Sequence, residues 1–315
     1  MIEDLVKKYQ AVTALNHLSL SIPANQIFGF VGPDGAGKTS LFQILCGILS
    51  ATSGKVTVLG LDLSRQSERL KEDLGYMSQK FALYADLTVR ENLDFFAELF
   101  RTPQAGMNEH KLKLLEFAGL VDFQGRLAGN LSGGMKQKLA LCCTLIHTPR
   151  LLILDEPTTG VDPVSRQEFW EMLMPLPKEG TTVIVSTAYM DEATRCDTVA
   201  MMDVGEILRV GTPLELRETL KGRVFEVKSS QLKQIKQLIA GRDWCEEVQI
   251  FGDRLHIRVQ SNWAGEVGQV SLGRLLDESG LNAVFKLVEP SLEDVFVSFL
   301  SSRTGAEVNG DSKSS

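Results

Sequence analysis

The stretch GFVGPDGAGKTS at residues 29–40 constrains the fold of this chain more than any other. An apolar run, IFGFV, leads into it, and a helical run, SLFQILCGIL, follows it. Gly32, Gly37, Lys38 and Thr39 fit the pattern G-x-x-x-x-G-K-[ST] in the strand–loop–helix setting that this motif needs. Glycines let backbone N–H groups curl around a phosphate, and the helix N-terminus adds its dipole. The alternative is a glycine-rich turn before a helix that carries a lysine.

The pattern therefore predicts a phosphate-binding loop inside an α/β domain. Lys38 would reach the β- and γ-phosphates of a nucleotide, and the Thr39 hydroxyl would bind Mg²⁺. The loop comprises consecutive residues, namely Gly32, Pro33, Asp34, Gly35, Ala36, Gly37, Lys38, Thr39 and Ser40.

A second feature is the run RLLILDEP at residues 150–157, an apolar strand that ends in Asp155 and Glu156. One carboxylate at a strand end can hold the Mg²⁺ shell, and its neighbour can polarise an attacking water. The alternative is a helix N-cap after a buried strand, a role that Asp also fills. Because a phosphate loop precedes it in the same chain, we favour the catalytic interpretation, with Asp155 as metal ligand and Glu156 as catalytic residue.

Between these two features lies LAGNLSGGMKQKLAL at residues 127–141. Ser132 and two glycines, Gly133 and Gly134, open a helix and leave backbone N–H groups exposed, which is a second anion-binding helix start. An isolated SGG would be an ordinary cap. The complete LSGGMKQ, placed just before the Asp-Glu strand, resembles the signature motif of the nucleotide-binding subunits of ATP-binding-cassette (ABC) transporters.

This resemblance covers residues 1–220 and implies a P-loop NTPase fold of the ABC type. Its parts would be a mixed sheet core, an antiparallel β subdomain and a helical signature region at about residues 80–150. It implies ATP and Mg²⁺ as cofactors. In the family, the signature of one cassette completes the ATP site of another, so Ser132, Gly133, Gly134 and Gln137 would contact nucleotide across a cassette dimer.

Further residues take roles from the same resemblance. GYMSQKFALYADLTVRENL at residues 75–93 looks like the Q-loop, with Gln79 contacting Mg²⁺ and water and the following segment facing the membrane subunit. Tyr9 matches the aromatic residue that stacks on adenine, with a core tyrosine as the alternative. TTGVDP at residues 158–163 matches the D-loop and places Asp162 near the dimer interface.

One position departs from the family pattern. STAYMDEA at residues 186–193 places Ala188 where the family has a histidine that contacts the γ-phosphate and the attacking water. A shift by one residue, with Thr187 or Tyr189 contributing, an engineered substitution, or tolerance of the loss are the alternatives. His110 and His147 lie on other segments and are poor substitutes. We expect slower hydrolysis, because one preorganised contact to a transition state is typically worth roughly a hundred- to a thousand-fold in rate.

The pattern of predicted strands and helices changes after Leu220, which indicates a small α+β domain of split-βαβ type at residues 223–300. Residues 223–229, 247–260 and 282–289 would form strands, with a hairpin turn at Gly252-Asp253. Residues 231–240, 268–280 and 291–300 would form helices, the last capped by Ser291. At the other end, LNHLSLSI and QIFGF at residues 15–22 and 26–30 suggest antiparallel strands, and the polar residues 301–315 suggest a disordered tail or linker.

Composition limits the class of protein. The net charge of −7 argues against a general nucleic-acid surface, and no apolar run approaches the ~18 residues of a membrane span. Cysteines at 46, 142, 143, 196 and 245 lack metal spacing and suggest reduced core thiols. We therefore expect a cytoplasmic protein, held at the inner face of the cell membrane by integral permease subunits, with no nucleic acid as partner.

The sequence thus predicts an ATP-hydrolysing motor subunit of an exporter, with a second cassette as partner, identical or different. VEPSLEDVFVSFL at residues 288–300 resembles the extension of exporter cassettes that work with separate membrane subunits. The alternative function is a poorly hydrolysing, regulatory half of an asymmetric pair. Translation and DNA-repair cassette ATPases fit less well, because only ninety-four positions without heptads separate Lys38 from Ser132.

Overall fold

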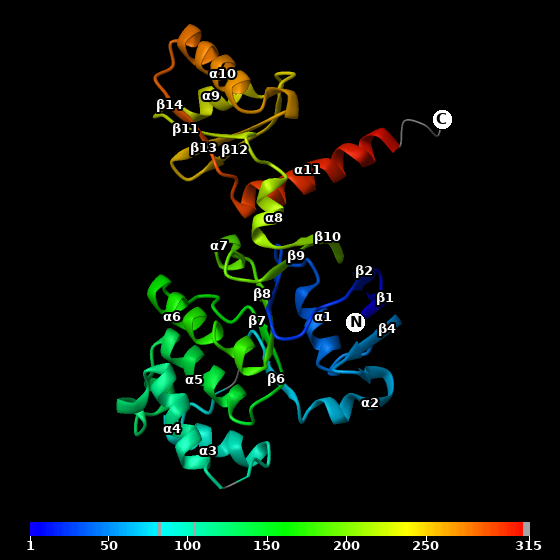
Figure 1. The fold of residues 1–315 in the computed structure, drawn as a ribbon, viewed down its shortest axis with the longest axis vertical. Helices are drawn as coiled ribbons and strands as arrows, with labels where there is room; N and C mark the ends of the chain where they lie inside the picture. The colour runs from blue at the N-terminus through cyan, green and yellow to red at the C-terminus, as the bar shows by residue number, and fades with distance from the viewer. Residues whose placement is uncertain (81–82, 104, 311–315) are drawn as a thin grey trace. The chain divides into compact units, whose positions relative to one another are not determined.

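The computed structural model describes residues 1–80, 83–103 and 105–310, with side chains to residue 301. The chain folds into two compact units, Met1–Val210 (unit 1) and Gly211–Ser315 (unit 2) (Figure 1). The division precedes the boundary expected at residues 220–223, because helix α8 (Pro213–Glu218) packs against helix α11 (Leu292–Gly310) of unit 2.

Unit 1 contains a six-stranded sheet in the order β10-β9-β3-β8-β7-β6. Strands β3, β8 and β9 pair in parallel, as do β6, β7 and β8. A two-residue turn, Val204-Gly205, joins β9 to β10 and makes this a mixed sheet, as predicted. The bounds are β3 Ile27–Val31, β6 Leu74–Met77, β7 Leu151–Asp155, β8 Thr182–Thr187, β9 Thr198–Asp203 and β10 Glu206–Gly211.

The expectation of an antiparallel strand at residues 26–30 is wrong. Strand β3 pairs in parallel on both sides, and all five of its residues are buried. A strand covered on both faces is typical of a parallel sheet, whereas the antiparallel strands before it have one exposed face.

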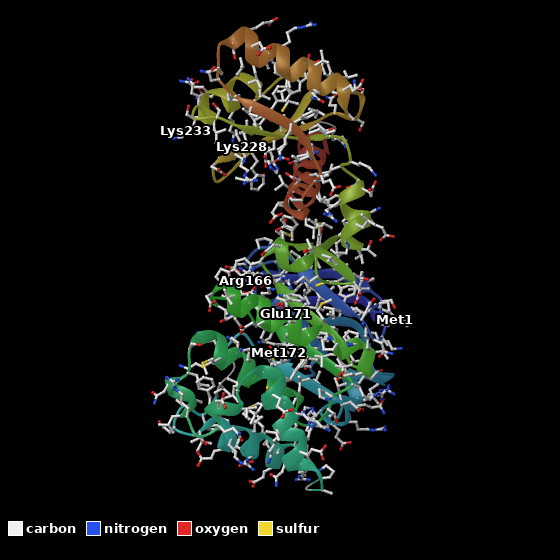
Figure 2. The ribbon with its side chains drawn as sticks, turned by 60° about the vertical axis from the view of Figure 1, so that its left-hand side comes forward. Met1, Arg166, Glu171, Met172, Lys228 and Lys233 are labelled. Carbon is white, nitrogen blue, oxygen red and sulfur yellow. The ribbon has the colours of Figure 1, made fainter. Side chains whose placement is uncertain are left out.

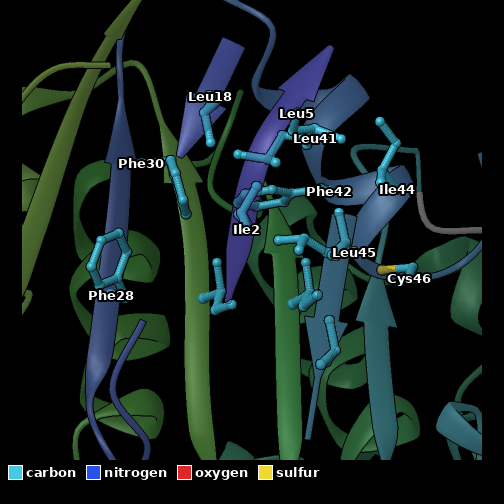
Figure 3. Close-up of a cluster of buried hydrophobic side chains, with 14 of the residues drawn as sticks. Ile2, Leu5, Leu18, Phe28, Phe30, Leu41, Phe42, Ile44, Leu45 and Cys46 are labelled. Atoms are coloured by element: carbon cyan, nitrogen blue, oxygen red, sulfur yellow. The ribbon is translucent and has the colours of Figure 1, made fainter. Parts of the chain in front are cut away.

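A second sheet of unit 1 has the order β2-β1-β4-β5. Its neighbouring strands are antiparallel, which confirms the predicted antiparallel β subdomain. Figure 3 shows the apolar core that this sheet shares with helix α1 and with strand β3 of the mixed sheet, including Ile2, Phe30 and Phe42. The core holds the start of α1 against both sheets. The bounds are β1 Ile2–Tyr9, β2 Val12–Leu20, β4 Ser53–Val58, β5 Leu61–Asp62 and α1 Lys38–Leu45.

The remaining elements of unit 1 are helices. The α-helices among residues 80–150 form the predicted helical region. Thr88 starts α3 with a capping box completed by Glu91. Residues 81 and 82 of the expected Q-loop lie outside the described residues. The helical bounds are α2 Leu63–Leu70, α3 Val89–Leu99, α4 Met107–Ala118, α5 Gly133–Leu145, α6 Pro163–Leu173, α7 Met190–Ala193, η1 Val121–Phe123, η2 Ala128–Asn130 and η3 Leu176–Glu179.

Unit 2 contains an antiparallel sheet in the order β12-β13-β11-β14. Strand β13 lies between β11 and β12, which is the split-βαβ arrangement predicted. Helices α9 and α10 cover one face through apolar residues such as Phe225, Ile235 and Leu272. The bounds are β11 Val224–Lys228, α9 Leu232–Ile239, β12 Cys245–Phe251, β13 Arg254–Val259, η4 Ser261–Trp263, α10 Glu266–Ser279 and β14 Val284–Val288.

Two local predictions in unit 2 are confirmed and one is corrected. The hairpin turns at Gly252-Asp253, and Ser291 caps α11 by accepting a hydrogen bond from the Asp294 N–H at 3.1 Å. Residues 301–310 of the tail expected at residues 301–315 are helical, because α11 continues from its capped and packed start, and residues 311–315 lie outside the described residues. Within the residues that the structure describes, no helix is both long and apolar enough to cross a membrane.

Candidate functional site

The loop between β3 and α1 depends on two glycines. Gly37 has φ 100° at the N-cap of α1, and a Cβ there would lie 2.4 Å from the Ala14 carbonyl oxygen. A Cβ on Gly32 would lie 2.1 Å from the Met202 carbonyl oxygen. Neither position can hold a side chain without moving backbone. The close packing leaves the loop curled over the start of α1, where the first N–H groups lack intrahelical partners.

Lys38 is the cation of this loop. Its side chain is 4% exposed, and Nζ donates to the carbonyl oxygens of Gly32 at 2.8 Å and Pro33 at 3.0 Å. Nζ also forms an ion pair with Glu156 Oε1 at 3.1 Å. A buried ammonium group needs such compensation, because an uncompensated charge in the interior is costly. The predicted phosphate loop and the predicted catalytic carboxylate are thus in direct contact.

Glu156 follows the end of β7 in an unusual backbone conformation, with φ 49°. Its Oε2 accepts hydrogen bonds from Gln79 Nε2 at 3.1 Å and from Thr159 Oγ1 at 3.3 Å. A positive φ is uncommon for residues other than glycine, and such conformations cluster at functional sites. Here it directs the carboxylate towards Lys38 and Gln79.

Asp155, the last residue of β7, is 1% exposed. Its Oδ1 accepts a hydrogen bond from Ser186 Oγ at 2.7 Å, and its Oδ2 has no hydrogen-bond partner among the described residues. Burial raises the pKa of the Asp155 carboxyl, and the hydroxyls of Ser186 and Thr39 oppose this rise. A buried carboxylate oxygen without a hydrogen bond destabilises the folded state unless an ion or another ligand binds to it.

The donors fit a hard divalent cation. Mg²⁺ prefers oxygen ligands and is usually held by one or two carboxylates together with substrate phosphates. Asp155 Oδ2, the Thr39 hydroxyl and the Gln79 side chain offer such a set beside the phosphate loop. The described residues include no cluster of three or more His, Cys, Asp or Glu side chains that could hold a metal by themselves.

Thr39 and Gln79 line one cavity of about 400 Å³ together with Lys38 and Glu156. Tyr9 lies at its margin, because its hydroxyl is 3.4 Å from Ser40 Oγ, and 43% of the residue is exposed. Its ring also lies 4.9 Å from Lys7 Nζ. The core alternative for Tyr9 is therefore wrong. The cavity is lined by Ala14, Asp34, Gly35, Gly37, Lys38, Thr39, Ser40, Gln79 and Glu156.

The signature residues lie at the start of helix α5, which is labelled in Figure 1, and they are not among the residues that line this cavity. Ser132 caps α5 by accepting a hydrogen bond from the Met135 N–H at 3.3 Å. A Cβ on Gly134 would lie 2.3 Å from Ser165, so this glycine permits close packing of α5 on α6. Gln137 lies one turn further along α5. Asp162 caps α6 by accepting from the Ser165 N–H at 3.0 Å.

Ala188 is exposed just after β8, and its neighbours are engaged elsewhere. Thr187 Oγ1 donates to Glu192 Oε2 at 2.6 Å, and the Tyr189 ring lies 4.2 Å from the Arg166 guanidinium. Arg166, labelled in Figure 2, also donates from Nε to Glu192 Oε1 at 2.9 Å. Neither Thr187 nor Tyr189 is among the residues that line the cavity.

Sequence reasoning missed Ser186 and Glu192. Glu192 is buried and joins the segment after Glu156 to the end of β8, because it accepts hydrogen bonds from both Thr158 and Thr187. Alternation along β8 was a usable signal, since Ser186 and Thr187 must point to opposite faces of the sheet. Nothing in the sequence named the partners on those two faces.

Comparisons with known proteins agree with this geometry. A family model described as ABC transporter matches residues 15–159. Over 216 residues the chain is 49% identical to the probable multidrug ABC transporter ATP-binding protein YbhF of Escherichia coli. The aligned region covers 69% of this chain and 37% of that protein. It is 34% identical over 301 residues to Nod factor export ATP-binding protein I of Rhizobium etli, covering 93% of this chain and 90% of that protein.

Among solved structures, cbiO1 from Clostridium perfringens, part of the ABC transporter complex cbiONQ, matches with a TM-score of 0.64 and 27% identity. The match covers 75% of this chain and 93% of that chain. The chain belongs to the family of ABC transporter ATP-binding proteins, and unit 1 has the P-loop cassette fold. Within that family, its similarity is to proteins named for export and drug resistance.

Proposed function

We propose that this chain binds ATP with Mg²⁺ and hydrolyses it as the motor subunit of an ABC exporter. The observation that carries the proposal is the contact of Lys38, Glu156 and Gln79 around one cavity, beside a buried Asp155 oxygen that has no hydrogen-bond partner among the described residues. The names of the exporter relatives support the direction of transport.

The side chains suggest how the reaction is served. A nucleotide phosphate in the loop would compete with Glu156 for the Lys38 ammonium group, because both are anions within its reach. Glu156, released from that ion pair and still bonded to Gln79, would then be free to polarise a water molecule. When bound, Mg²⁺ supplies charge neutralisation at the phosphates, and Asp155, Thr39 and Gln79 would hold it.

We further propose that a second cassette completes the site. Ser132 and Gly134 form an anion-binding helix start that does not line the cavity of their own chain. The start of α5 would therefore serve the nucleotide of a partner cassette, either a second copy or a different one. ATP would close the pair and hydrolysis would reopen it, and permease subunits contacted through the Q-loop segment would hold the protein at the cytoplasmic face of the membrane.

A regulatory cassette with slow hydrolysis is the second candidate, and Ala188 favours it. Its methyl group can neither donate nor accept a hydrogen bond, and the alternatives Thr187 and Tyr189 have other partners. In that case the chain would act mainly by binding ATP opposite a competent cassette.

Steady-state phosphate release by the purified chain tests the proposal, with Glu156→Gln as background. Turnover that depends on Mg²⁺ and falls to background in Glu156→Gln supports the motor function. ATP binding with equal, negligible phosphate release from both proteins favours the regulatory cassette. Absence of ATP binding contradicts both candidates.

A further inference from the structure

The hydroxyl of Ser186 lies between the two acidic residues of the site. Ser186 is on β8, directly opposite Asp155 in the parallel register with β7, and its exposed fraction is 0%. Its Oγ is 2.7 Å from Asp155 Oδ1 and 2.9 Å from the Glu156 backbone nitrogen. One small side chain therefore contacts both residues that stand beside the phosphate loop.

The direction of these two hydrogen bonds follows from chemistry. The Glu156 N–H can only donate, so Ser186 Oγ accepts there. A hydroxyl has one proton, and Ser186 therefore donates it to Asp155 Oδ1. This bond uses one carboxylate oxygen and fixes the rotation of the group, which leaves Oδ2 as the oxygen without a hydrogen bond from the residues that the structure describes.

The second hydrogen bond acts on the backbone of Glu156. That residue has φ 49°, a conformation that persists only when surrounding contacts hold it. The bond from its N–H to Ser186 is such a contact, and it is made inside the sheet, where water cannot replace it. The Glu156 side chain then reaches Lys38 and Gln79.

We propose that Ser186 is a positioning residue that sets the direction of both carboxylates, aiming Asp155 Oδ2 at the bound cation and Glu156 at the attacking water. The inference rests on the proposed ATPase function and adds a residue to it. Removing a group that hydrogen-bonds to a metal ligand and orients it typically lowers metal affinity or activity by about 10- to 100-fold.

A buried serine that only satisfies its own hydroxyl would affect stability alone. Ser186→Ala removes the hydroxyl with almost no change in volume, and Ser186→Thr keeps it. Thr144→Val is the matched control, because it removes another buried hydroxyl of unit 1, one that donates to the Ala140 carbonyl oxygen at 2.8 Å within α5. All variants are made in the full chain.

The measurement is the Mg²⁺ concentration that half-saturates binding of a fluorescent, non-hydrolysable ATP analogue, with analogue binding in EDTA as a second readout. We expect Ser186→Ala to raise that concentration about tenfold or more and to leave binding in EDTA unchanged, while Thr144→Val and Ser186→Thr keep the wild-type value. Turnover of Ser186→Ala should fall as well, at saturating Mg²⁺, because Glu156 is no longer held.

The inference is overturned if Ser186→Ala shows the wild-type Mg²⁺ dependence, or if Thr144→Val shows the same shift. Either result leaves the ATPase proposal standing. Absence of Mg²⁺-dependent analogue binding in the wild-type chain instead contradicts the proposed function itself, and this inference with it.

Discussion

The protein compensates one pair of buried carboxylates in unit 1 very differently from a pair in unit 2. In unit 1 they are Asp155 and Glu156 at the end of β7. In unit 2 they are Glu226 on β11 and Asp294 on α11. All four side chains are largely withdrawn from water, so each needs compensation from the protein or from something that binds to it.

The pair in unit 2 is compensated by the protein. Asp294 accepts from His256 Nδ1 at 2.8 Å through Oδ1, and from the Ser291 N–H and hydroxyl at 2.8 and 2.7 Å through Oδ2. Glu226 accepts from Arg254 at 2.9 Å and lies 3.5 Å from Lys286 Nζ. Every oxygen of this pair has a polar partner, as expected of a cluster that holds a structure together.

The pair in unit 1 is compensated only in part. Asp155 keeps an oxygen that has no hydrogen-bond partner in the described part of the chain, and burial raises the pKa of its carboxyl. Burial would also raise the pKa of Asp294, but the hydrogen bonds from His256 and Ser291 lower it overall. The difference indicates that unsatisfied buried polar groups, and not buried charge as such, separate a site from a structural cluster.

The largest expected effect is on nucleotide binding. Lys38→Ala removes the buried cation of the unit 1 site and leaves Glu156 uncompensated, so we expect ATP affinity to fall roughly a hundredfold or more. Calorimetric titration measures it. Lys138→Ala is the control. Lys138 forms an ion pair with Glu168, with 2.8 Å between Nζ and Oε2, and neither residue lines the cavity. Equal affinity in Lys38→Ala and the wild type would remove the central claim.

Two matched substitutions should change the free energy of unfolding of the two units by different amounts. Asp294→Asn breaks a saturated cluster and should lower the free energy of unfolding of unit 2 by about 2 kcal/mol. Asp155→Asn relieves a buried charge with an unused oxygen and should cost no more than about 0.5 kcal/mol, or stabilise unit 1. Denaturant unfolding without nucleotide and metal measures both, with Trp244 and Trp263 reporting on unit 2 and Trp170 on unit 1. Equal losses in the two units would contradict the distinction.

Ala188→His adds a polar group to the unit 1 site. We expect turnover to rise by roughly tenfold or more, because a single preorganised contact to a transition state can be worth that much or more. ATP affinity should change little, since the binding contacts lie on the phosphate loop. Phosphate release from both proteins, with Glu156→Gln as background, gives the answer. Brisk wild-type turnover that Ala188→His does not increase would mean that another group performs this role.

The smallest expected effect is the pH dependence of unit 2. The hydrogen bond to Asp294 raises the pKa of His256, and Glu226 adds to this while burial opposes it. Stability from a raised histidine is complete below about pH 6.5 and is lost as pH rises through the folded pKa. The lowered pKa of Asp294 has the reverse sign, so its contribution is complete above about pH 4 and is lost as pH falls further.

Unit 2 should therefore be most stable between about pH 4 and 6.5 and weaken as pH rises further through the raised pKa of His256. Arg254 and Lys286 form ion pairs with Glu226, and Arg258 lines the same small pocket as His256 and Asp294. Urea unfolding followed by tryptophan fluorescence at several pH values tests the prediction, and His256→Gln should flatten the alkaline slope. A slope that His256→Gln leaves intact would assign the titration to another group.

Features that depend only on neighbours along the chain can be predicted from the amino-acid sequence. The loop at residues 32–40 follows from glycines that tolerate close packing and positive φ, and the cap at Ser291 and the turn at Gly252-Asp253 follow from equally local chemistry. The strand that ends in Asp155 and Glu156 was also visible, because a continuous apolar run bounded by polar residues predicts a buried strand.

Contacts between segments that are distant in the sequence become visible only in the folded chain. The parallel pairing of β3, the packing of α8 against α11 and the two hydrogen bonds of Ser186 join residues far apart in sequence. Such contacts depend on strand order and register, which are chosen by the fit of the whole core and not by any local run of residues. Alternation along β8 assigns Ser186 to one face of the sheet, but its role becomes visible only when its neighbours are known to be the two acidic residues of the site.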